Sequence, residues 1–169
     1  MILTKSELIA SLQHEVRILL HLAGKIDRAW LDYRPTPKQR STLELLRYLS
    51  IMGPMLVQLA LAEKRDPALF QNATKEANER DFDQTLAAIA AQSDTYAKLL
   101  GDVPDAYFRT AMQGFDGANT TRGAFIVNLV LSGCAAYRTQ LFLYLKACGR
   151  TELTTSDLWR GVDAPAAAV

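Results

Sequence analysis

Four long segments of the chain place apolar residues at intervals of three and four, the repeat of an amphipathic helix. They run from about Thr4 to Ile26, from Ser41 to Glu63, from Asp81 to Leu100 and from Arg122 to Ala147. No long segment shows the strict alternation that is typical of a half-buried strand. Four helices of this length in one domain predict an all-α four-helix bundle.

Short signals mark where these helices begin and end. Thr4 with Glu7, and Ser41 with Glu44, have the spacing of capping boxes. Gly149 is placed to end the last helix. These signals predict the boundaries of the first, second and fourth helices.

The connections between the helices are long. Pro54 lies within the second helix, where its missing donor predicts a kink. The connection at 64–80 has room for a short helix of its own, and the one at 101–120 for a short pair of strands before the last helix. We expect one domain over residues 1–163 and a frayed tail over 164–169.

Composition excludes several classes of function. Hydrophobic residues make up 49% and charged residues 22% of the 169 residues, and the net charge is +1. This balance is typical of a soluble globular protein and gives no attraction to nucleic acid or to a membrane. The N-terminal residues lack a signal-peptide pattern, so the cytoplasm is the expected location. Cys134 and Cys148 lie too far apart along one helix for a disulfide.

The last helix carries an unusual inward stripe, which consists of Gly133, Tyr137, Gln140 and Tyr144. Bundles place metal ligands on such faces, but this helix has no His, Asp or Glu between residues 122 and 147. The two histidines, His14 and His21, lie opposite the apolar stripe of the first helix. We expect them on a solvated face, with a subunit interface as the alternative.

Three stretches together resemble the DinB/YfiT-like superfamily of bundle proteins. LDYRPTPKQRSTLELLRYLSIMG resembles the entry to its second helix, CAAYRTQLFLYLKACG its last helix and ELTTSDLWRGVD its C-terminal end. The resemblance implies a four-helix bundle that often pairs as a homodimer. It also implies a divalent metal held by three histidines, one on the second helix and two on the fourth.

Position by position, the resemblance places the three metal-binding histidines on Tyr48, Gly133 and Tyr137. All three ligands are therefore missing, and we expect a degenerate site with no metal and no other cofactor. In their place we expect a small central pocket with Met52, Cys134, Arg138 and Gln140 as neighbours. The two phenol rings should fill the gap beside Gly133, and their hydroxyls should bond each other, Gln140 or a water.

Three functions stay open at this point. The first is an uncharacterised bundle protein whose Tyr-lined pocket takes an unknown small molecule. The second is a thiol-dependent S-transferase or isomerase of the DinB/YfiT type, which needs a Lewis acid to activate its thiol. The third is a homodimeric protein-interaction module. The missing histidines argue against the second function, because fold analogy does not carry an activity whose site is gone.

Overall fold

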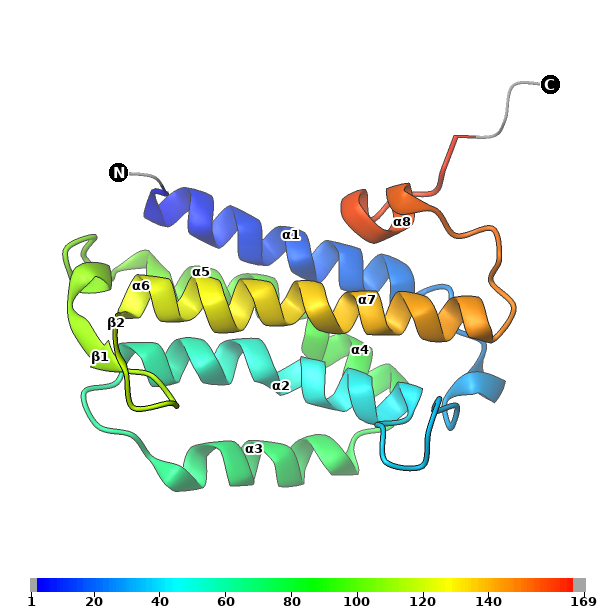
Figure 1. Ribbon diagram of the computed structural model, residues 1–169, viewed down its shortest axis with the longest axis horizontal. Coiled ribbons are helices and arrows are strands. Elements are labelled where there is room, and N and C mark those ends of the chain that lie inside the picture. Colours follow the sequence, from blue (N-terminus) through cyan, green and yellow to red (C-terminus); the bar gives the residue numbers. More distant parts are fainter. Residues whose placement is uncertain (1–2, 166–169) are drawn as a thin grey trace.

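The computed structural model describes residues 3–165, and four long helical segments lie side by side in it as a bundle (Figure 1). Fully buried side chains from each segment, among them Leu12, Leu45, Ile89 and Leu141, form the core. The predicted all-α bundle is confirmed. Its long helices are α1 (Lys5–Ala23), α2 (Thr42–Leu61), the pair α4 (Phe82–Ala90) and α5 (Gln92–Gly101), and the series α6 (Arg122–Phe125), η3 (Ile126–Leu131) and α7 (Ser132–Ala147).

Both predicted capping boxes are present. The Thr4 hydroxyl accepts from the Glu7 backbone N–H, and the Ser41 hydroxyl from that of Glu44, while each glutamate reaches back to its cap. The helix α2 runs without a break through Pro54. The third predicted helix is instead divided at Ala91, between α4 and α5. A short 3-10 helix, η1 (Arg28–Trp30), lies in the arm between α1 and α2.

The connection at 64–80 contains α3 (Pro67–Glu79), which packs outside the bundle against α2 (Figure 1). Asp66 caps it and Pro67 occupies its first turn, where a missing backbone donor costs nothing. Leu69, Ala73 and Ala77 turn toward Ile51 and Met55 of α2. The helix therefore adds a wall beside α2 rather than a fifth member of the bundle.

The predicted pair of short strands is also confirmed. After the 3-10 helix η2 (Tyr107–Arg109), β1 (Ala111–Gln113) pairs antiparallel with β2 (Asn119–Thr121). The turn between them contains Gly117 at a φ of 79°, a conformation that favours glycine. This hairpin leads directly into the last long helix.

The last long helix changes its winding partway along. The segment η3 is a π-helix, and the Ser132 hydroxyl bonds the Val127 carbonyl five residues earlier at 3.2 Å. Such wide turns inside α-helices are frequent at functional sites. The helix ends after Ala147, and Gly149 follows at a φ of 108°, as the sequence predicts.

The expectation of a solvated face around His14 and His21 is wrong. The C-terminal helix α8 (Thr155–Arg160) covers that face (Figure 1). The His21 ring bonds the buried Asp157 carboxylate at 2.9 Å, and His14 bonds the Trp159 carbonyl at 3.2 Å. Ile18, on the same side of α1, is fully buried. Helical periodicity missed this contact because α8 is too short to show a pattern.

By length and composition alone, the stretch Arg122–Ala147 could cross a membrane. In this fold it packs against α1 and α2, and 28% of its most apolar window is buried. Arg122 and Arg138 are themselves buried within it. Residues 166–169 of the tail that is expected to fray lie outside the described residues.

Candidate ligand-binding groove

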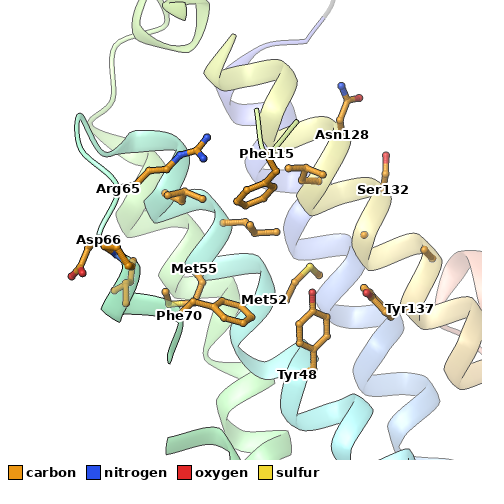
Figure 2. A pocket seen from close by; sticks show the side chains of 17 residues that line it. Tyr48, Met52, Met55, Arg65, Asp66, Phe70, Phe115, Asn128, Ser132 and Tyr137 are labelled. Carbon is orange, nitrogen blue, oxygen red and sulfur yellow. The ribbon is translucent and has the colours of Figure 1, made fainter. Parts of the chain in front are cut away.

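A groove with a volume of about 800 Å³ lies between α2, α3 and the segment η3–α7 (Figure 2). Apolar side chains provide most of its surface. Met52, Met55, Leu56 and Leu59 come from α2, Leu69 and Phe70 from α3, Leu129 from η3, and Phe115 from the hairpin loop. A cavity of this size with a mainly apolar lining is typical of small-molecule sites.

The mouth of the groove is unusually apolar. Phe70 is 43% exposed and Phe115 is 62% exposed, although both are large aromatic residues. The Arg65 guanidinium lies 5.3 Å from the centre of the Phe115 ring and bonds the Gly114 carbonyl at 3.2 Å. Exposed aromatic residues that rim a cavity mark a candidate binding site.

The three positions that the resemblance identified, Tyr48, Gly133 and Tyr137, come together at one end of this groove. The Tyr48 and Tyr137 rings meet edge to face, with their centres 5.1 Å apart and their planes at 70° (Figure 2). Both phenols are half-buried. The site is larger than the small pocket expected from the sequence, and it lies at the edge of the bundle rather than in its centre.

The sequence predicts that the two phenol rings fill the gap beside Gly133. In the structure, a methionine fills it instead. A β-carbon at position 133 would lie 3.2 Å from the Met52 sulfur and 3.5 Å from its methyl group. Methionine is unbranched and flexible, so it readily fills an irregular gap of this kind. Met52 is 1% exposed and forms the floor of the groove.

The inward stripe expected on the last helix is only partly correct. Tyr144 is buried, but its hydroxyl accepts from the Gln140 amide and donates to the Arg40 carbonyl at 2.9 Å. Gln140 therefore pairs with Tyr144 rather than with Tyr48 or Tyr137, and it does not line the groove. This end of the helix faces the arm that leads into α2.

Arg138 and Cys134, two further expected neighbours, point into the bundle instead of the groove. An Arg138 nitrogen lies 3.4 Å from a Glu15 carboxylate oxygen on α1, and the arginine is 4% exposed. Burial raises the pKa of the Cys134 thiol to about 12. A thiol with so high a pKa supplies no thiolate nucleophile at neutral pH.

Tyr48, at the end of the groove, is a neutral hydrogen-bonding group. Burial, and next the adjacent Tyr137, raise the pKa of Tyr48 to about 12, while Arg40 opposes the rise. The Arg40 guanidinium carbon lies 4.1 Å from the centre of the Tyr48 ring. Tyr48 thus keeps its proton at neutral pH and can donate it to an oxygen or nitrogen atom of a ligand.

The residues of the groove do not fit a three-histidine metal site. Gly133 offers no donor atom, and the Met52 sulfur occupies the space next to it. Loss of the Tyr48 proton, which phenolate ligation requires, is costly at a pKa of about 12. Among residues 3–165, Asp66 is the only acidic residue that lines the groove, and it caps α3 at the rim.

Sequence patterns identified one end of the groove and missed the rest. The wall formed by α3, the Phe115 loop and the Arg40 side chain over Tyr48 were not anticipated. Asp66 followed by Pro67 is a helix-start signal that predicts α3 itself. No local signal shows that α3 stands off from α7 and leaves a groove between them.

No known protein-family profile matches the sequence, and no curated protein matches it either. The fold is similar to the crystal structure of a DinB-like protein, YjoA, from Bacillus subtilis, with a TM-score of 0.69. The two share 17% sequence identity, and the match covers 88% of this chain and 95% of the other. The protein has a DinB-like fold, which confirms the fold that the resemblance in the sequence implies.

Proposed function

We propose that the protein binds a predominantly apolar small molecule in the groove between α2, α3 and α7. The observation that carries this proposal is the groove of about 800 Å³, whose methionine, leucine and phenylalanine walls end at the Tyr48–Tyr137 pair. Burying an apolar ligand there removes its surface and that of Phe70 from water. The Tyr48 and Tyr137 hydroxyls form hydrogen bonds with the polar end of the ligand and so orient it.

Binding of a small molecule without metal chemistry accounts best for Tyr48, Gly133 and Tyr137, the positions at which the resemblance places metal-binding histidines. A thiol transferase of the DinB/YfiT type needs an activated thiolate, and neither the phenols nor the Cys134 thiol supplies the means to form one. An apolar groove that ends at the protonated Tyr48 hydroxyl suits the apolar body of a ligand. The proposed role is therefore binding of a predominantly apolar ligand.

Filling the groove should weaken this binding. Leu56→Trp places a larger side chain on the groove wall at a half-buried position, so the fold should tolerate it. We expect the wild-type protein to bind the uncharged dye Nile red with a rise in fluorescence, and the variant to bind it at least about tenfold more weakly. Fluorescence titration measures both dissociation constants.

Gln58→Trp is the matched control, because Gln58 is a half-buried residue of the same helix that does not line the groove. It should bind the dye as the wild-type protein does. Equal binding by Leu56→Trp and the wild-type protein would place the dye elsewhere and would contradict the proposal.

A second expectation concerns metal content. We expect the protein, purified without a histidine tag, to contain less than about 0.1 equivalents of zinc or nickel, because phenol and glycine are poor replacements for imidazole. Elemental analysis by plasma mass spectrometry measures this ratio. A ratio near one metal per chain, reduced by Tyr48→Phe, would show that the phenols act as ligands after all.

A further inference from the structure

A second, smaller hollow of about 260 Å³ adjoins the groove. The two share Tyr48 and Phe70, whose ring centres are 6.4 Å apart. The smaller hollow has a larger share of polar surface than the groove, and we call it the polar hollow; its other lining residues are Arg40, Glu44, Arg47, Ile51, Thr74, Ala77 and Asn78. A ligand that lies across the Tyr48 and Phe70 rings therefore reaches an apolar and a polar compartment at once.

The polar hollow carries an excess of positive charge. Its acid, Glu44, is already engaged by the Arg34 guanidinium at 3.3 Å and by the Ser41 backbone N–H at 2.7 Å. Of its two arginines, Arg47 donates to the Arg80 carbonyl at 2.7 Å. These contacts leave Arg40 as the cation that remains available to a ligand.

Arg40 is placed for this role. Its guanidinium lies against the face of the Tyr48 ring at 4.1 Å, which holds the side chain over the boundary between the hollows. Within residues 3–165 its side chain makes no hydrogen bond and no ion pair. Its backbone carbonyl is anchored by the Tyr144 hydroxyl at 2.9 Å, so the base of the side chain is fixed.

We propose that the ligand is an amphipathic anion, with an aliphatic chain in the apolar groove and a carboxylate that pairs with Arg40 in the polar hollow. This inference rests on the proposed function, because it assigns the class of ligand to the same groove. The planar guanidinium presents two parallel N–H donors that match the two oxygens of a carboxylate. The Tyr48 hydroxyl, which keeps its proton, supplies a further donor near the head group.

Calorimetric titrations with decanoate and with decan-1-ol test this assignment, since the two share a ten-carbon chain and differ in head group. We expect the wild-type protein to bind decanoate about tenfold more tightly than decanol, because a charge-assisted hydrogen bond is stronger than a neutral one. Arg40→Gln should remove this preference and leave decanol binding unchanged. Leu56→Trp should weaken the binding of both compounds.

Lys38→Gln is the matched control, because it removes one positive charge from an exposed residue of the same arm. It should keep the tenfold preference for decanoate, whereas Arg40→Lys should keep only part of it because the ammonium lacks the planar pair of donors. Circular dichroism verifies that each variant is folded.

Three results would overturn the inference in distinguishable ways. Equal binding of decanoate and decanol by the wild-type protein would contradict the assignment of an anionic head group but would still agree with ligand binding in the apolar groove. Equal weakening of both compounds by Arg40→Gln would show that Arg40 only packs on Tyr48. Binding of neither compound, together with no binding of Nile red, would contradict the proposed function itself.

Discussion

Arg138→Met is expected to lower the free energy of unfolding by about 3 kcal/mol at neutral pH. The arginine is 4% exposed, and it faces the Glu15 carboxylate at 3.4 Å from the neighbouring helix α1. Removing it leaves a carboxylate in the bundle without a compensating charge. We place the effect at the lower end of the usual range, since the pair makes no direct hydrogen bond. Urea denaturation measures the change.

The loss should depend on pH in a defined direction. Burial raises the pKa of Glu15, and Arg138 opposes this rise, so the pKa should rise further in the variant. A carboxyl group whose pKa is higher in the folded than in the unfolded protein destabilises the fold above that pKa, and this cost disappears as the group becomes protonated. Arg138→Met should therefore be less destabilising near pH 4.5 than near pH 7.

A double variant provides the control for this interpretation. Arg138→Met leaves the Glu15 carboxylate buried without a partner, and Glu15→Gln removes that charge. The two changes together should therefore lower the free energy of unfolding by less than Arg138→Met alone at pH 7. If the double variant is as unstable as the sum of the two single variants, the loss comes from packing of the arginine stem and the pairing argument fails.

Gly53→Ala is expected to destabilise the protein by about 3 kcal/mol, against the usual preference for alanine in helices. A β-carbon at this position would lie 1.9 Å from the Tyr96 hydroxyl oxygen and 3.1 Å from the ring carbon that carries it. Tyr96 is 1% exposed and its hydroxyl donates to the Gln92 side-chain oxygen at 3.2 Å, so the ring cannot move away without disturbing these core contacts. Thermal and urea unfolding both measure the effect.

Two comparisons separate this clash from a general effect of alanine. Gly101→Ala, at the end of α5, adds a β-carbon that meets no atom within 4 Å and should change stability by less than about 1 kcal/mol. Tyr96→Phe alone should cost ~1 kcal/mol, the worth of one hydrogen bond. Combined with Gly53→Ala it should relieve part of the clash, so strictly additive losses would contradict the close approach of Gly53 and Tyr96.

Helix positions could be predicted well from local information. The capping boxes at Thr4 and Ser41, the strand pair before the last helix and the glycine that ends it are short-range signals, and the structure confirms each one. The orientation of the last helix was harder to predict. Its buried face includes Arg138, which the sequence analysis places beside the central pocket and which the structure instead pairs with Glu15 of α1.

For the candidate site too, the sequence identified some residues, and other contacts were visible only in the structure. Tyr48, Gly133 and Tyr137 were identified from their positions in a resembled motif, and the structure brings them to one end of a groove. The use of Met52 to fill the gap beside Gly133, and the position of Arg40 on the Tyr48 ring, depend on side-chain packing between segments far apart in the chain. Local pattern does not encode such contacts.

By itself, the sequence determined the helical class, the ends of the long helices and the absence of histidine at positions 48, 133 and 137, because each depends on residue type and spacing along a single segment. The tertiary structure decided that α3 stands beside α2 and creates a groove of about 800 Å³, that α8 covers His14 and His21, and that Arg138 is buried. These features depend on which segments meet in space. That choice is set by the burial of apolar surface summed over the whole chain, which no local pattern contains.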